Sequence, residues 1–288
     1  MWIVEGRVEA VSRALSRIGV ESILRFEEEL DPQYRVMQSI ADLAGRGFAA
    51  VYGLLAGVAS YRLAMPGEEW WECFGSMIYS RRKHSPPGTV EDVIGDVVWF
   101  LENCRGSIIG REAKIARVKR VGSRAQRLLA LMARDPRVVI RDPLGVARSL
   151  ASSLSTDYWR KTVLFAVKLA YYAARPWGSR EVLAIEVPIP VDLRVACASI
   201  SSGIIGGAKG VEEVVSKPAV CQKAWSMVSQ KSGVPPMHID SLLWVLGRYL
   251  RGLPRERAVS EMAGLISRIT GEEEALSLAR ELAWKGGC

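Results

Sequence analysis

The stretch that decides the fold runs Asp157-Tyr-Trp-Arg-Lys161-Thr-Val-Leu-Phe-Ala-Val-Lys168-Leu-Ala-Tyr-Tyr172. It is strongly apolar, and its residues recur with the period of a helix rather than with the alternation of a strand. Lys161, Phe165, Lys168 and Tyr172 are spaced i, i+4, i+7 and i+11, so they share one face of the predicted helix. This stretch therefore predicts a largely buried helix that carries two lysines beside aromatic rings.

The same helical period continues outward from this stretch over most of the chain. The sequence predicts an amphipathic N-terminal helix and then further helices, one ending at Leu30-Asp31-Pro32 and others over 33–45, 47–63 and 90–104. The one extended segment is Val187-Pro-Ile-Pro-Val191, because its two prolines prevent a helix. The predicted class is all-α, with about 12 to 15 helices of typical length.

The composition is that of a soluble globular protein. The 288 residues include 39 Lys and Arg against 31 Asp and Glu, so the formal charge is 39 − 31 = +8, and the pI is near 9.4. This charge points weakly toward a polyanionic partner. Nine Trp and two His argue against histidine-centred chemistry and supply many flat aromatic surfaces.

The cysteines and the apolar segments exclude several classes of protein. The five cysteines have no C-x-x-C pair, so no zinc or iron–sulfur spacing is present, and we expect reduced thiols that mostly fill core in a cytoplasmic protein. The N-terminus is interrupted by charges and is not expected to be a signal peptide. The longest apolar stretch, 48–59, is too short for the roughly 20 residues of a membrane span.

A basic stretch from Arg105 to Arg127 admits two interpretations. It follows a polar break at Arg81–Gly88 and could be either a solvated helix face or a surface that tracks phosphates. Its central basic residues are Arg111, Lys114, Arg117, Lys119, Arg120 and Arg124.

Three clusters could carry chemistry, and each also has a structural explanation. Lys161, with Thr156 or Asp157 as a helix cap, could be a nucleophilic amine, or its stem could simply cover apolar surface. Asp192 follows the proline-rich segment and is first of all a helix N-cap, a role compatible with stabilising a cationic transition state. Asp240, Trp244 and Gly247 share a stripe that suits either a pocket wall or packing between lobes, while His238 nearby is expected to be structural.

With these clusters in view, the sequence resembles the archaeal 8-oxoguanine DNA glycosylase family (AGOG), a branch of the helix-hairpin-helix DNA glycosylases. Eight segments match in the order of the family and over most of the chain. They are Asp31-Pro-Gln33-Tyr-Arg, Ser60-Tyr-Arg-Leu, Gly67-Glu-Glu-Trp-Trp71-Glu-Cys-Phe-Gly, Lys161 to Lys168, Pro188-Ile-Pro190-Val-Asp192, Gln222-Lys-Ala-Trp225, Pro235-Pro-Met-His-Ile-Asp240-Ser-Leu-Leu-Trp244, and Trp284-Lys-Gly-Gly-Cys288.

The resemblance implies roles for individual residues. Lys161 corresponds to the Schiff-base lysine and Asp192 to the catalytic aspartate. The positions that would contact the extruded base are Gln33, Ser60, Trp71, Phe165, Lys168, Pro190, Asp240 and Trp244. Trp71 and Trp244 would be the aromatic walls, although Trp70 is an alternative to Trp71. The family needs no metal or other cofactor for this chemistry.

The resemblance also implies an architecture. Residues 1–288 are expected to form a single catalytic unit of two helical sublobes, with the active site in the cleft between them and a helix-hairpin-helix-like region at about 140–204. Residues from about 76 to 155 match the family poorly, and the Leu-Pro-Gly-x-Gly hairpin of the wider superfamily is missing. The DNA contacts of that stretch are therefore left open.

The implied activity is base excision repair. Lys161 would displace 8-oxoguanine from DNA, duplex or single-stranded, and β-elimination would then cut the strand 3′ to the lesion, which makes a monomeric bifunctional glycosylase and lyase. Two other classes are weighed against it. A non-catalytic helical nucleic-acid-binding module would bind DNA without cutting it, and a helical protein-interaction scaffold would show no salt-dependent affinity for DNA.

Overall fold

The computed structural model describes all residues 1–288 and confirms the all-α class. It contains sixteen α-helices, one short 3-10 helix and two strands of two residues each. The expected 12 to 15 helices is too low a number, because α8 (Val138–Arg141) and α12 (Val211–Ser216) have only four and six residues. No helix is both long enough and apolar enough to span a membrane.

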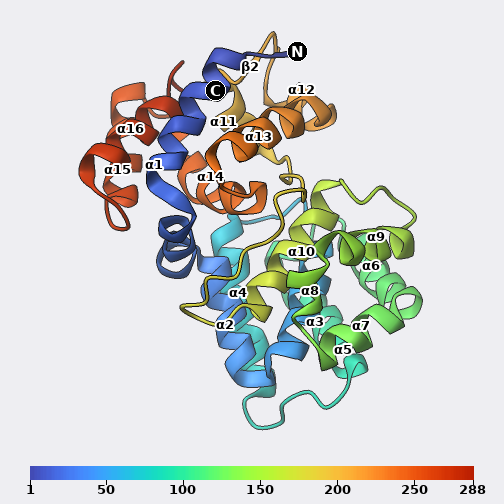
Figure 1. The fold of residues 1–288 in the computed structure, drawn as a ribbon. Helices are drawn as coiled ribbons and strands as arrows, with labels where there is room; N and C mark the ends of the chain where they lie inside the picture. Colours follow the sequence, from blue (N-terminus) through green and yellow to red (C-terminus); the bar gives the residue numbers. More distant parts are fainter. The chain divides into compact units, whose positions relative to one another are not determined.

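The chain divides into two compact units (Figure 1). Unit 1 comprises Met1–Leu30 and Val182–Cys288, and unit 2 comprises Asp31–Glu181. The elements of unit 1 are β1 (Trp2–Ile3), α1 (Glu5–Leu30), α11 (Leu193–Ser201), β2 (Ile205–Gly206), α12, α13 (Ala219–Ser232), α14 (Pro236–Leu250), α15 (Arg255–Ile266) and α16 (Glu272–Leu282).

Unit 2 is a single run of helices. Its elements are α2 (Pro32–Ala44), α3 (Arg46–Ala59), α4 (Gly67–Arg82), α5 (Val90–Asn103), the 3-10 helix η1 (Arg105–Ser107), α6 (Arg111–Arg124), α7 (Gln126–Arg134), α8, α9 (Pro143–Leu154) and α10 (Lys161–Ala174). The helix predicted over 90–104 is α5, and Thr89 and Asp92 close a reciprocal capping box at its start.

Helix α10, which carries Lys161 and Lys168, lies against α3 at the centre of unit 2. Gly53 and Gly57 of α3 let the two backbones approach closely. A Cβ at Gly57 would lie 2.5 Å from the Cα of Ala166, and one at Gly53 would lie 2.7 Å from the carbonyl oxygen of Leu169. Because only glycine fits at both places, this contact fixes the position of α10 and of the residues that it carries.

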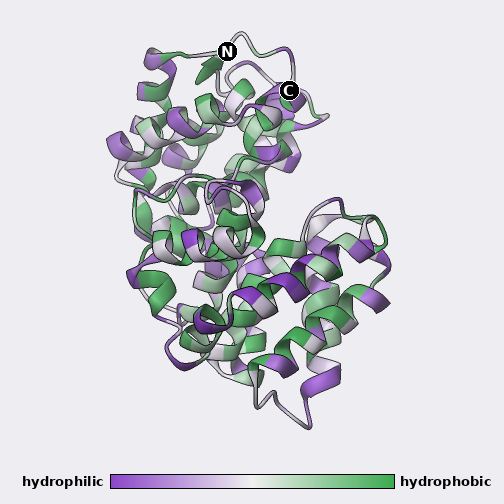
Figure 2. Cartoon of the chain, turned by 90° about the vertical axis from the view of Figure 1, so that its right-hand side faces the viewer, coloured by the Kyte–Doolittle hydropathy of each residue, from purple (hydrophilic) through white to green (hydrophobic).

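Unit 1 is built around the long helix α1. Gly19 has a non-helical backbone (φ 73°, ψ 157°) and breaks α1 into two parts, which agrees with the two helices that the sequence predicts there. The antiparallel pair β1–β2 joins the N-terminus to the chain after α11. Green and purple residues alternate along the helices in Figure 2, as expected for helices that bury one face.

A disulfide between Cys197 and Cys288 corrects the expectation that the thiols are reduced. The two Cα atoms are 5.2 Å apart, and the bond ties the C-terminus to α11. Cys73, Cys104 and Cys221 are free. No local pattern predicts this pair, since the two cysteines are 91 residues apart and only the fold of unit 1 brings them together.

The helix-hairpin-helix-like region expected at about 140–204 includes elements of both units. Helices α9 and α10, joined by residues 155–160, lie in unit 2, and α11 lies in unit 1. The assignment of this range stays a prediction.

Candidate active site

Lys161 is the first residue of α10, so the helix begins later in the chain than the predicted start near Asp157. The preceding helix α9 ends at Leu154, and Ser155 closes it in the left-handed conformation (φ 53°). Neither Thr156 nor Asp157 caps α10, because the N-cap position is Arg160 and Asp157 forms an ion pair with Arg160 instead (3.7 Å). Lys161 is therefore half-buried at a helix start that no side chain caps.

Lys168, two turns further along α10, is held by an ion pair. Its Nζ lies 3.9 Å from Oδ2 of Asp31, and both side chains are almost fully buried. The hydroxyl of Tyr172 donates to the same carboxylate oxygen at 2.9 Å. The ammonium group lies 5.9 Å from the ring centre of Phe165 and 5.3 Å from that of Tyr172. Lys168 is thus a compensated cation in a fixed position.

Asp31 connects this ion pair to Gln33. Oδ1 of Asp31 accepts the backbone N–H of Gln33 at 2.9 Å and so caps α2. The side chain of Gln33 is fully buried, yet neither its amide nitrogen nor its amide oxygen has a hydrogen-bond partner. An unpaired buried amide is costly, so its presence calls for a functional explanation.

Trp70 and Trp71 differ in what surrounds them. The indole N–H of Trp70 donates to Oγ of Ser107 at 3.0 Å, and its ring stacks on Phe74. Trp71 instead meets Phe165 edge to face, with ring centres 6.0 Å apart, and it is 1% exposed. The indole N–H of Trp70 therefore already has a hydrogen-bond partner in the core, whereas the ring of Trp71 contacts Phe165 of α10.

Ser60 ends α3 and begins the turn to α4. Its hydroxyl donates to the carbonyl of Gly57 at 2.9 Å, and the residue is 6% exposed. Since Gly57 is the residue pressed against α10, the position of Ser60 depends on the contact between α3 and α10.

The remaining predicted site residues belong to unit 1. Asp192 is the N-cap of α11, as expected, because its Oδ1 accepts the backbone N–H groups of Arg194 (2.8 Å) and Val195 (2.9 Å). Pro190 lies in the extended segment before it, which Gln222 anchors by donating to the carbonyl of Ile189 at 3.1 Å. The carboxylate of Asp192 is therefore held in a fixed orientation.

Asp240 and Trp244 lie one turn apart on α14 and are 2% and 8% exposed. The guanidinium of Arg194 lies over the Trp244 ring, 4.6 Å from its centre, and donates to the Trp244 carbonyl. Gly247 makes room for this, because a Cβ there would lie 2.8 Å from the Cβ of Arg194. The stripe predicted from sequence is thus occupied by an arginine–tryptophan stack.

His238 has the structural role expected for it. Its Nε2 accepts the N–H of Leu183 at 3.1 Å, so Nδ1 carries the proton that lies between it and Oε1 of Glu27 (2.8 Å). The ring joins α14 to α1 inside the core of unit 1.

No group of three or more His, Cys, Asp or Glu side chains is arranged to hold a metal.

Comparison with known proteins identifies the family. The model of the family described as AGOG, N-glycosylase/DNA lyase, matches residues 12–280. The chain belongs to the AGOG family. The resemblance read from the eight segments is therefore confirmed, and the protein is a bifunctional DNA glycosylase and DNA lyase.

Relatives of this AGOG protein come from archaea. The N-glycosylase/DNA lyase of Aeropyrum pernix is 45% identical over 278 residues, which cover 96% of this chain and 94% of that protein. The one of Pyrobaculum aerophilum is 32% identical and covers 88% of this chain and 93% of its own. A crystal structure of the 8-oxoguanine DNA glycosylase Pa-AGOG from Pyrobaculum aerophilum, complexed with 8-oxoguanosine, matches at a TM-score of 0.76 with 28% identity over 99% of both chains.

The ten predicted site residues of the AGOG chain divide between the units. Unit 2 holds Gln33, Ser60, Trp71, Lys161, Phe165 and Lys168, and unit 1 holds Pro190, Asp192, Asp240 and Trp244. Asp31 and Arg194 also contact members of this set, although the sequence assigned a site role to neither. Asp31 holds Lys168, and Arg194 covers Trp244. In the sequence, Asp31 stands at the turn before Pro32 and opens one of the eight family segments, but neither feature gives a hint of a lysine 137 positions away.

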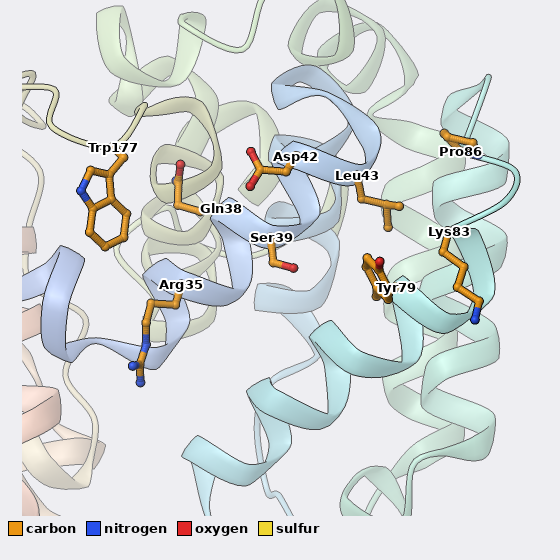
Figure 3. Close-up of a pocket in the computed structure, with 9 residues that line it drawn as sticks. All are labelled: Arg35, Gln38, Ser39, Asp42, Leu43, Tyr79, Lys83, Pro86 and Trp177. Atoms are coloured by element: carbon orange, nitrogen blue, oxygen red, sulfur yellow. The ribbon is translucent and has the colours of Figure 1, made fainter.

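An open pocket of about 690 Å³ lies elsewhere in unit 2, along α2 and the end of α4 (Figure 3). Its lining residues are Arg35, Gln38, Ser39, Asp42, Leu43, Tyr79, Lys83, Pro86 and Trp177. None of the ten predicted site residues lines it. Gln38, which faces it from α2, is tied to the carbonyl groups of Tyr172 and Arg175 at the end of α10 (2.6 and 3.1 Å).

Proposed function

We propose that this AGOG-family enzyme excises 8-oxoguanine from DNA through a Schiff base on Lys161. The observation that carries the proposal is the buried, unpaired amide of Gln33 next to the Asp31–Lys168 ion pair. A free amide of this kind can both donate to and accept from the edge of a nucleobase, and forming those bonds removes the cost of leaving it unpaired.

Recognition requires that the damaged nucleotide leave the duplex. Flipping costs on the order of a few kcal/mol, and stacking on aromatic rings returns about 1–3 kcal/mol per base. Trp71 and Trp244 are the proposed aromatic walls. The edge-to-face contact of Trp71 with Phe165 on α10 supports Trp71 over Trp70, whose indole N–H is already bonded to Ser107.

Discrimination from guanine depends on N7. In 8-oxoguanine N7 carries a hydrogen and donates, whereas in guanine it accepts. We assign the accepting group to the carbonyl of Pro190, in the segment that Gln222 anchors, while Gln33 and Asp240 read the rest of the base. A site built around the N7–H donor leaves its own acceptor unpaired when guanine enters, which is an effective form of rejection.

Chemistry then takes place at C1′ of the deoxyribose. The free amine of Lys161 forms a bond to C1′ as the bond from C1′ to the base breaks, and the departing base takes up a proton. Asp192 stabilises the positive charge that builds on the sugar, a role that suits a carboxylate oriented by two backbone N–H groups. Opening of the sugar gives the protonated Schiff base, a C2′ proton is lost, and the bond to the 3′ phosphate breaks.

The test is borohydride trapping on a duplex that contains 8-oxoguanine. The wild-type protein is expected to form a covalent complex, and Lys161→Gln is expected to form none. Lys209→Gln, which removes an exposed lysine of unit 1, is the matched control and should trap like the wild type. Undiminished trapping by Lys161→Gln would refute the role of Lys161, and DNA binding without trapping or cleavage by the wild type would favour the non-catalytic binding module.

A further inference from the structure

The basic helix α6 presents three cations on one inward face. Arg111, Lys114 and Arg117 are spaced i, i+3 and i+6, so they lie along one side of the helix. Lys114 is fully buried and both arginines are half-buried, which contradicts a purely solvated face. The exposed basic residues of the same helix are Lys119, Arg120 and Arg124.

These cations meet the turn that begins at Ser60. The Nζ of Lys114 donates to the carbonyl of Arg62 at 3.3 Å and lies 5.5 Å from the ring centre of Tyr61. Arg62 has a positive φ of 47°, an unusual conformation for a residue other than glycine. Lys114 therefore helps to hold the turn that Ser60 opens.

Arg117 reaches the start of α10. Its Nη2 donates to the hydroxyl of Thr162 at 2.7 Å, and its guanidinium lies 6.0 Å from the ring centre of Tyr61. Thr162 directly follows Lys161 in the chain. Arg117 is thus a cation placed beside the residue that carries the nucleophilic amine.

The charge of this cluster is not balanced within the protein. The partners of Lys114 and Arg117 are carbonyls, a hydroxyl and an aromatic face, and no carboxylate forms an ion pair with either residue or with Arg111. The Nε atoms of Arg111 and Arg117 are buried without a hydrogen-bond partner. Burial lowers the pKa of both Lys114 and Arg117, which is the sign of cations that lack an anion.

We propose that Arg117, which shares one side of α6 with Arg111 and Lys114, binds a backbone phosphate of the DNA strand that carries the lesion, next to the nucleotide attacked by Lys161. A phosphodiester supplies the missing negative charge, and the guanidinium can bind it through two parallel hydrogen bonds. The assignment rests on the proposed function, because the phosphates that flank a sugar are the anions nearest to its C1′. A bound phosphate would also supply a partner for the guanidinium of Arg117, which the single hydrogen bond to Thr162 leaves without a negative charge.

The experiment measures DNA binding without turnover. Lys161→Gln protein is titrated with a fluorescent 8-oxoguanine duplex, alone and combined with Arg117→Gln, with Thr162→Val, or with Lys119→Gln as the matched loss of an exposed cation from α6. Arg117→Gln is expected to weaken binding about tenfold, the effect of one charge-assisted hydrogen bond. Between about 50 and 200 mM salt, the slope of the logarithm of the association constant against the logarithm of the salt concentration is expected to be shallower by about 0.9 for Arg117→Gln, the value for one lost phosphate contact. Lys119→Gln should change the affinity less than about twofold.

Neutral methylphosphonates placed one at a time along the lesion strand then locate the contact. At one position beside the lesion, a methylphosphonate should lower the DNA affinity of the protein that keeps Arg117 by the same factor as Arg117→Gln does. The same methylphosphonate should not lower the affinity of the Arg117→Gln protein any further. Additive losses at every position, or a Thr162→Val variant that reproduces the whole effect, would overturn the phosphate site. Because no step here requires catalysis, a failure of borohydride trapping refutes the proposed function without deciding this result.

Discussion

Two regions of unit 2 bury cations beside aromatic rings, and they differ in one respect. Around Lys168 the charge is balanced by Asp31, which Tyr172 and the start of α2 hold in place. Around Lys114 and Arg117 the neighbours are carbonyls, a hydroxyl and the ring of Tyr61, with no carboxylate. The first region is complete in the free protein, whereas the second gains its counter-charge from a partner.

The largest effect on stability is expected when the region around Lys168 loses the carboxylate that balances its charge, so that it resembles the region around Lys114 and Arg117. Asp31→Asn keeps a good helix cap but removes the charged carboxylate from the buried ion pair between Asp31 and Lys168. We expect the free energy of unfolding to fall by about 3–5 kcal/mol, measured by denaturant titration.

Asp142→Asn is the matched control for this substitution. Asp142 also caps a helix, α9, but it is exposed and has no buried lysine beside it, so its loss should cost less than about 1 kcal/mol. Equal losses in the two variants would mean that Asp31 acts only as a cap. Adding Lys168→Met to Asp31→Asn should restore part of the lost stability.

A smaller effect of opposite sign is expected at Gln33, next to the balanced pair. Gln33→Met keeps the shape of the side chain and removes its two unpaired polar atoms. The free energy of unfolding should rise by about 1–3 kcal/mol, while single-turnover excision of 8-oxoguanine should slow. A variant that is destabilised would show that the amide has a partner in the folded protein and would remove the observation on which base recognition rests.

The sequence predicted the elements of both regions but not their contacts. Helix α10 followed from its apolar period, and Asp192 as a cap followed from its place after two prolines. The predicted start of α10 was wrong by several residues, because residues 157–160 form a turn in which the backbone N–H of Arg160 donates to the carbonyl of Asp157. The local pattern predicts that a helix forms but defines its ends less well.

Contacts between distant residues had no sequence signal. The pairing of Asp31 with Lys168, the stack of Arg194 on Trp244 and the Cys197–Cys288 disulfide each depend on the packing of helices far apart in the chain. The family resemblance supplies long-range information that periodicity and capping rules do not contain. It added Gln33, Ser60, Trp71 and Pro190 and gave a role to each of the ten candidates, whereas local pattern alone had singled out Lys161, Phe165, Lys168, Asp192, Asp240 and Trp244. Likewise, the basic stretch from Arg105 to Arg127 was evident in the sequence, but only the fold shows which of its cations are buried and which are exposed.

The smallest effect concerns how stability depends on pH in the unbalanced region. Burial, aided by the nearby charge of Arg111, lowers the pKa of Lys114 from its ordinary value of 10.5. Between the lowered value and 10.5, the unfolded chain therefore holds more protons at this site than the folded protein does, and the site's contribution to stability increases with pH. Lys114→Met removes this contribution, so the stability of the wild type relative to Lys114→Met should increase as the pH approaches 10.5. Denaturant titrations of both proteins over this range measure the difference, and a constant difference would mean that Lys114 keeps its ordinary pKa and that its charge is balanced after all.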